Sequence, residues 1–90
     1  AYEPVWAIGT GNPANPDDVL SAKIFIRKIL SNLYGRKEAD KVRVLYGGST
    51  DRKNAASFTK DGNADGLLVG GESLDAEEFV EMLKNVYENS

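Results

Sequence analysis

The stretch Val42-Arg43-Val44-Leu45-Tyr46-Gly47-Gly48-Ser49 decides the fold class, because an apolar run ends directly in a pair of glycines. Branched and aromatic residues favour a strand over 42–46, and glycine permits a tight exit from it. The same form recurs at Leu67-Leu68-Val69-Gly70-Gly71, with one helical segment between the two. This repeat predicts successive βα units.

The first helical segment has clear boundaries. Asn15 suits an N-cap, Pro16 suits the first helical position, and the two aspartates that follow suit the positive end of the helix dipole. Apolar residues then recur at helical spacing, and Gly35 suits the end of the helix. The sequence therefore predicts a helix over 16–34, followed by a charged connection.

The last helix also has a well-marked start. Asp75 and Glu78 have capping-box spacing, and Leu74 and Phe79 have the spacing of a hydrophobic staple. In full, the sequence predicts strands at about 1–6, 42–46 and 66–69 and helices at about 16–34, 52–60 and 76–88. This β-α-β-α-β-α order, without hairpin patterns, predicts an α/β domain over 1–90, with three parallel strands and right-handed crossovers.

Composition removes several classes of function. The 90 residues carry a net charge of −3, which disfavours binding to a nucleic acid backbone. The absence of Cys and His excludes disulfides, thiolate metal sites and histidine chemistry, so acid–base groups must be Asp, Glu, Lys or Tyr. No signal peptide or long apolar run is visible. We expect a cytoplasmic protein with neither nucleic acid nor a membrane as its partner.

The two Gly-Gly turns suggest an anion site. Glycines after adjacent parallel strands let backbone amides point together at a ligand, and Ser49 adds a hydroxyl. Phosphate sites in αβ barrels are built from such neighbouring loops. The alternative, that both are only tight strand-to-helix turns, stays open.

Glu3 is placed at the end of the first predicted strand, at the same edge as both Gly-Gly turns. Catalytic groups collect there in parallel α/β proteins, and a carboxylate beside apolar residues can serve as a general base. A solvated, inert glutamate is the alternative.

The loop after Glu3 has the features of a lid. Gly9 and Gly11 could act as hinges, with Trp6 and Ile8 as apolar anchors, and the loop to Ala14 is long for a βα connection. The alternative is an ordinary loop that carries a core tryptophan.

Three other patterns carry no cofactor prediction. Gly9-Thr10-Gly11 lacks the remaining glycine of a dinucleotide fingerprint, and Gly47-Gly48-Ser49 has no following Gly-Lys. An acidic cluster surrounds the start of the last helix: Glu72, Asp75, Glu77, Glu78 and Glu81. We interpret it as a solvated helix start. Neither a metal nor a cofactor is expected.

The sequence resembles the triosephosphate isomerase family over all 90 residues. Ala1-Tyr2-Glu3-Pro4-Val5-Trp6-Ala7-Ile8-Gly9-Thr10-Gly11 is similar to the family's sixth strand and lid loop. Tyr46-Gly47-Gly48-Ser49 is similar to the motif after its seventh strand, and Asp65-Gly66-Leu67-Leu68-Val69-Gly70-Gly71 to the region of its eighth. The resemblance implies a (βα)3 segment of a (β/α)8 barrel.

The resemblance also implies roles. Glu3 would be the base that moves a proton between the carbons of dihydroxyacetone phosphate and glyceraldehyde 3-phosphate through an enediolate. The amides implied to hold the substrate phosphate are those of Gly9, Ser49, Gly70 and Gly71. Tyr46 and Ser49 would latch the closed lid near Ala14 and Gly11, with Trp6 at its leading end. Closure would exclude water and protect the enediolate.

The sequence departs from the family pattern in two places. Asn12-Pro13 stands where the family commonly has Lys-Thr, which restricts the trailing hinge. Glu72 stands where the family often has Ala, which adds a negative charge beside the phosphate loops. Both bear on lid motion and phosphate affinity.

A complete barrel needs about 250 residues and eight strands, and the family's catalytic Lys and His, like its dimer-forming loop, are upstream of the matched region. The sequence therefore predicts the C-terminal third of the enzyme, inactive alone and prone to form homo-oligomers. A non-catalytic (βα)3 module that self-assembles or complements a missing part is the main alternative. Another phosphate-binding barrel enzyme is a weaker one, disfavoured by Glu3-Pro4.

Overall fold

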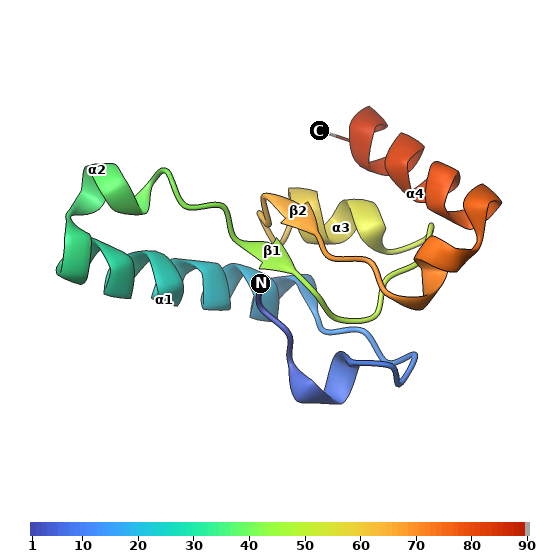
Figure 1. Ribbon diagram of the computed structural model, residues 1–90, viewed down its shortest axis with the longest axis horizontal. Coiled ribbons are helices and arrows are strands. Elements are labelled where there is room, and N and C mark those ends of the chain that lie inside the picture. The colour runs from blue at the N-terminus through green and yellow to red at the C-terminus, as the bar shows by residue number, and fades with distance from the viewer. Residues whose placement is uncertain (90) are drawn as a thin grey trace.

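The computed structural model describes residues 1–89. Within them the sheet has two short strands, β1 (Leu45–Tyr46) and β2 (Gly66–Leu67). The α-helices are α1 (Pro16–Tyr34), α2 (Arg36–Ala39), α3 (Ala55–Lys60) and α4 (Ala76–Glu88). Two 3-10 helices, η1 (Val5–Ala7) and η2 (Gly71–Leu74), complete the described elements. Figure 1 shows α1 and α2 at one end of the molecule and α4 at the other.

The strands are parallel, and the first residues of the chain add to them. β1 pairs with β2 so that Leu45 lies opposite Gly66, and Tyr2 forms a parallel bridge with Tyr46. The Tyr2 amide donates to the Leu45 carbonyl at 2.7 Å, whereas the Leu68 amide donates to the Tyr46 carbonyl at 2.9 Å. Successive carbonyls of a strand point to opposite sides, so Tyr2 and β2 flank β1.

The strand expected over 1–6 is wrong beyond this bridge. Pro4 has no amide to continue a ladder, and the chain turns into η1, where the Ala7 amide donates to the Pro4 carbonyl at 2.9 Å. The other two strands are also shorter than the expected 42–46 and 66–69. The fold is α/β with parallel strands, but the described residues contain two strands and a bridge rather than three strands.

The start of α1 follows from its N-cap, because the Asn15 side chain accepts a hydrogen bond from the Asp17 amide at 2.8 Å. Gly35 follows at a φ of 87°, which glycine adopts readily. The next helix, α2, lies where the sequence predicts only a charged connection. α3 begins at Ala55 rather than near 52, since Asp51 Oδ1 holds the Lys53 and Asn54 amides in a turn.

The start of α4 differs in part from the expected capping box. Asp75 Oδ1 accepts from the Glu78 amide at 3.1 Å, as a cap should. The Glu78 carboxylate accepts instead from Arg52, at 2.8 Å from its amide and 2.5 Å from its Nε. Leu74 is 90% exposed and so makes no staple. Glu78 therefore ties α4 to the segment that precedes α3.

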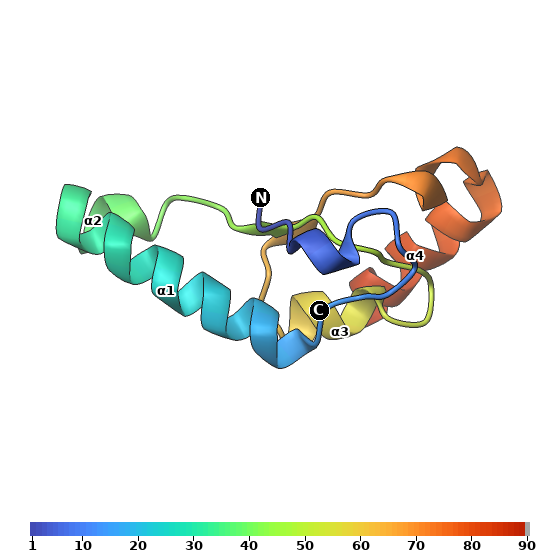
Figure 2. The ribbon, with the colours of Figure 1, turned by 90° about the horizontal axis from the view of Figure 1, so that it is seen from below.

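The core is small and lies between the sheet and the helices beside it. Its buried residues are Ala7, Ala14, Val19, Tyr46, Phe58 and Ala64. The rings of Tyr46 and Phe58 stack with centroids 4.1 Å apart. Figure 2 shows α1 and α3 on one side of the strands. Much of α1 extends past this core, and Ile24, Phe25 and Leu33 are exposed.

Candidate functional site

Three loops that are distant in sequence meet in one pocket of about 450 Å³. They are the loop after η1, the loop after β1 and the loop after β2. Residues that line it are Ile8, Gly9, Gly11, Gly47, Gly48, Ser49, Thr50, Asp51, Asn54, Gly70, Gly71 and Glu72. Two of these loops follow the carboxyl ends of parallel strands, where α/β proteins bind ligands.

Glu3 does not line this pocket, but its side chain lies against Gly47, which does. A Cβ added at Gly47 would stand 2.6 Å from Glu3 Cγ and 3.0 Å from its Oε1. Real Cβ contacts do not approach so closely, so the side chain of Glu3 rests on Gly47 because that residue has none. The carboxylate is exposed rather than buried among apolar residues.

Tyr46 joins the end of the loop after Glu3 to the loop after β1. Its hydroxyl accepts from the Ala14 amide at 3.0 Å and donates to the Ser49 carbonyl at 3.3 Å. The side chain is fully buried, and burial raises the pKa of the phenol. A side chain at Gly48 would collide with the Tyr46 ring. The glycine pair thus makes room for both Glu3 and Tyr46.

Ser49 holds the beginning of the loop after Glu3, at Ala7. Its amide donates to the Ala7 carbonyl at 2.7 Å, and its Oγ donates to that carbonyl at 2.6 Å. Both donors are therefore engaged with Ala7 in this structure, and neither donates to Gly11. For the Ser49 amide to hold a phosphate, the bond to Ala7 has to open.

Residues 6–11 form a turn that is closed on itself and is exposed except at Ala7, which is buried in the core. Thr10 Oγ1 donates to the Trp6 carbonyl at 2.7 Å and accepts from the Asn12 amide at 3.1 Å. Gly9 and Gly11 have φ of 64° and 73°, a region that favours glycine. Trp6 is 56% exposed. The loop therefore does not carry a core tryptophan.

The loop after β2 presents open glycines to the pocket. A Cβ at Gly70 or Gly71 would meet nothing within 4 Å. Ser73 folds back on this turn, because its amide and its Oγ donate to the Gly70 carbonyl at 3.0 and 2.6 Å. The space in front of these backbone atoms is where a ligand can approach.

The charged residues that line the pocket within residues 1–89 are both acidic, Asp51 and Glu72. Asp51 and Asn54 are lining residues that the sequence interpretation missed, although an Asp and an Asn soon after a Gly-Gly pair are a usable pattern. No group of three or more acidic side chains in the described residues is placed to hold a metal ion. An anion in this pocket would depend on backbone amides and hydroxyls.

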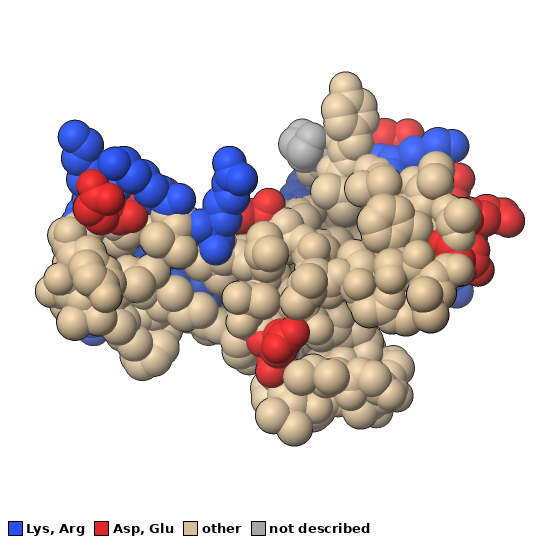
Figure 3. All heavy atoms as spheres, in the orientation of Figure 1, with Lys and Arg blue, Asp and Glu red and all other residues tan. Residues whose placement is uncertain are grey.

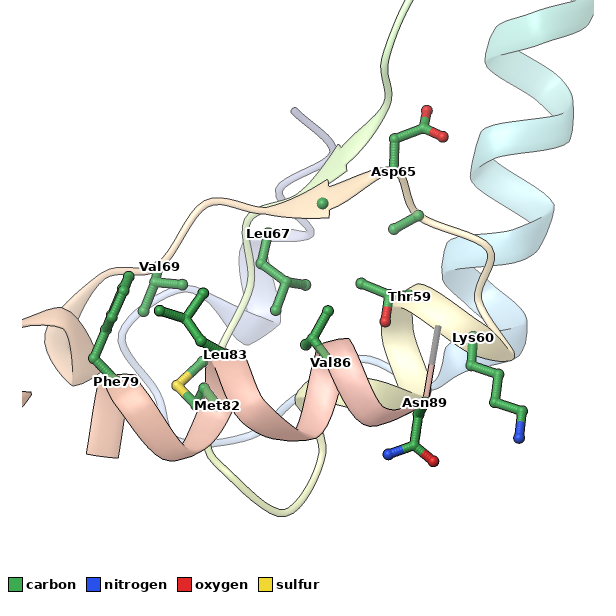
Figure 4. Close-up of a pocket in the computed structure, with 12 residues that line it drawn as sticks. Thr59, Lys60, Asp65, Leu67, Val69, Phe79, Met82, Leu83, Val86 and Asn89 are labelled. Atoms are coloured by element: carbon green, nitrogen blue, oxygen red, sulfur yellow. The ribbon is translucent and has the colours of Figure 1, made fainter. Parts of the chain in front are cut away.

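A second pocket, of about 500 Å³, lies between β2, α3 and α4. Figure 4 shows Leu67 and Val69 of the strand region opposite Met82, Leu83 and Val86 of α4. Its lining is mainly apolar, and the sequence interpretation did not anticipate it. No helix within residues 1–89 has the length and apolar character needed to cross a bilayer.

Comparison with known proteins identifies the family of this chain. The model of the triosephosphate isomerase family matches residues 1–86. The triosephosphate isomerase of Chlamydia abortus is 46% identical over 87 residues, which are 97% of this chain and 34% of that protein. That of Thermus thermophilus is 52% identical over 84 residues, covering 93% and 34%. The chain thus spans about a third of the length of the curated relatives that it matches.

Proposed function

Because the chain belongs to the triosephosphate isomerase family, we propose that it carries the base, the lid and the phosphate-binding loops of a triose-phosphate isomerase. The reaction interconverts dihydroxyacetone phosphate and glyceraldehyde 3-phosphate in glycolysis and gluconeogenesis. The observation that carries this proposal is the meeting of three glycine-containing loops in one pocket, with Glu3 resting on one of them.

Glu3 is the proposed base. Its carboxylate removes a proton from the hydroxyl-bearing carbon next to the carbonyl of dihydroxyacetone phosphate and leaves an enediolate. It returns the proton to the former carbonyl carbon, while the hydroxyl proton passes from the oxygen of the first carbon to that of the second. Partial charge on the enediolate oxygens requires donors, and loss of such stabilisation typically costs 100- to 1,000-fold in rate. The resemblance places those donors, a Lys and a His, in a part of the family that this sequence does not include.

The phosphate would enter the pocket between Gly9 and the Gly70-Gly71 turn. Its oxygens would accept from these amides, and from the Ser49 amide once that amide leaves the Ala7 carbonyl. Triosephosphate isomerase is itself a standard example of lid closure. Closure over Glu3 would exclude water, with the Tyr46 hydroxyl already bonded to the Ala14 amide at the trailing end. This function implies a cytoplasmic location, with the complete enzyme as a homo-oligomer and no cofactor.

The test is an isomerase assay with and without a polypeptide that supplies the first two thirds of the Thermus thermophilus relative. We expect no turnover from this chain alone and measurable turnover from the mixture. Glu3→Gln should lower that turnover at least about 100-fold, the usual scale for a general base. Glu88→Gln, an exposed glutamate on α4, is the matched control and should retain it. Turnover that survives Glu3→Gln overturns the assignment of the base.

A second candidate function is a non-catalytic module that associates with copies of itself. The exposed apolar residues of α1 and α4 favour it, because Phe25, Leu33 and Leu83 are 63%, 66% and 56% exposed. Sedimentation of the chain alone distinguishes the two. Oligomers that do not dissociate when the complementing polypeptide is added, and a mixture without turnover, would favour the module.

A further inference from the structure

Glu72 is a charged residue of the phosphate pocket without a compensating partner among the described residues. It lies in η2, directly after Gly70 and Gly71, and it lines the pocket. No hydrogen bond or ion pair of its carboxylate is present within residues 1–89. No described residue therefore neutralises this carboxylate beside the open turn that the proposed function assigns to a phosphate.

Asp51, the other acidic residue of the pocket, is in a different situation. Its Oδ1 accepts from the amides of Lys53 and Asn54 at 2.8 and 3.0 Å. Hydrogen bonds from backbone amides partly offset a carboxylate's charge. Glu72 has no such bonds, so its field in the pocket is the less compensated of the two.

Basic side chains do not offset it either. The charged residues of the described pocket lining are Asp51 and Glu72 alone. Arg52, which is adjacent in sequence to the pocket, directs its Nε to Glu78 instead. On the face that Figure 3 shows, most of the basic side chains lie over α2 and the segment after it, and acidic side chains lie around the start of α4.

From this arrangement we propose that Glu72 is an affinity-determining residue that weakens the binding of a phosphate dianion in this pocket. The inference rests on the proposed function, since it concerns the same anion site. Repulsion between a carboxylate and a dianion acts on substrate and product alike, because both carry the same phosphate group. Glu72 therefore raises the KM and speeds product release, with little effect on the chemical step.

The experiment is a titration of the chain with inorganic phosphate at pH 7.5, followed by the backbone amide signals of Gly70 and Gly71 in nitrogen-15 NMR spectra. Glu72→Gln removes the charge and keeps the shape. We expect it to bind phosphate about three- to tenfold more tightly, the scale of charges several ångströms apart in a partly solvated site. Glu77→Gln is the matched control, since it removes an exposed charge from the first turn of α4, outside the pocket lining.

Salt separates repulsion from a structural role. The difference between the chain and its Glu72→Gln variant should shrink when 0.5 M sodium chloride is added, because screening shortens the reach of the charge to a few ångströms. A structural role would leave the difference unchanged. In the complemented isomerase, Glu72→Gln should lower the KM by a similar factor and leave kcat within about twofold.

The outcomes are distinguishable. Equal phosphate binding by the chain and by Glu72→Gln, with both glycine signals responding, overturns the role of Glu72 and leaves the phosphate site intact. A difference that salt does not reduce also overturns it. If no variant shows a response at Gly70 or Gly71, the phosphate site itself is wrong, and this inference falls with it.

Discussion

At the scale of single residues, Gly47 positions Glu3 by having no side chain. A methyl group at Gly47 would stand 2.6 Å from Glu3 Cγ, so Gly47→Ala must move the carboxylate. A displacement of about 1 Å can cost roughly 100-fold in rate. We expect a loss of that order in the complemented isomerase assay, without loss of the fold.

A double-mutant comparison tests whether Gly47 acts by positioning Glu3. In a Glu3→Gln background, Gly47→Ala should add little to the loss, because the group that it displaces is already inactive. Independent, multiplicative losses would contradict positioning through Glu3 and would indicate a separate function of the loop.

Tyr46 offers a second test at this scale, now of stability. Tyr46→Phe keeps the stack on Phe58 but leaves the buried Ala14 amide without its acceptor. An unpaired buried donor costs about 1–3 kcal/mol, which urea unfolding measures. Tyr34→Phe, at a position that is 67% exposed, is the control and should change the free energy of unfolding little. Equal effects of the two substitutions would contradict the assigned hydrogen bond.

The sequence predicts which residues lie at the strand ends, but it does not predict the hydrogen bonds that these residues make. The pattern placed Glu3 and the two Gly-Gly turns at one edge, with residues 6–11 as a lid. The structure brings the two Gly-Gly turns and residues of that lid loop to one pocket, and Glu3 lies against one of the turns. The pattern gave no indication that both donors of Ser49 are held by Ala7. That bond depends on how η1 turns after Pro4, and a turn of three residues leaves no periodic pattern.

At the scale of elements, Asp65 joins α1 to the strands. Its carboxylate pairs with Lys23 Nζ at 3.1 Å and with Arg27 Nη2 at 3.3 Å, and accepts from the Val44 amide at 2.7 Å. Partial burial alone would raise the pKa of Asp65, but the Val44 amide, Lys23 and Arg27 together outweigh it and lower the pKa. A lowered native pKa stabilises the fold at any pH above the ordinary pKa of an aspartate.

This lowered pKa of Asp65 predicts that the protein loses stability as the pH falls into the acid range. The contribution of Asp65 is complete above about pH 4, the unfolded value, and is lost as the pH falls through the lower native pKa. Asp65→Asn should cost about 1 kcal/mol at pH 7 and should flatten the acid decline of stability. Urea unfolding at pH 7 and pH 3 measures both, with Asp61→Asn in the adjacent turn as the control. An unchanged acid decline in Asp65→Asn would overturn this assignment.

Element ends show why local patterns are incomplete. The Asn15 cap of α1 and the Asp75 cap of α4 form, because each needs only its own first turn. The second half of the expected box fails because Glu78 has a better partner in Arg52, far away in sequence. Arg52 competes with the local donor, the Asp75 amide, for the Glu78 carboxylate. The spacing of residues along the chain does not reveal such a distant donor.

At the scale of the whole molecule, the described core is too small to cover the apolar residues of its own helices. The apolar residues of α1 recur at helical spacing, which predicts one buried stripe that includes Ile29 and Leu33. These two side chains are nevertheless 41% and 66% exposed. Within residues 1–89 no strand pairs with the outer edge of β2, and the pocket between β2 and α4 is also open. Burial requires a neighbouring layer, and the periodicity of one helix cannot tell whether that layer is present.

We therefore expect the isolated chain to associate as its concentration rises from about 5 to 200 μM, measured by sedimentation equilibrium. Open strand edges and large apolar patches are the usual causes. Phe25→Glu places a charge on the exposed part of α1, where Phe25 is 63% exposed, and should shift association to higher concentration. Lys28→Glu, also exposed on α1, is the control because it makes a larger change in charge without removing apolar surface. A monomer across the whole range, with a sharp cooperative thermal transition, would contradict this expectation, since it would mean that the small core suffices to hold α1 and α4 with their apolar sides in water.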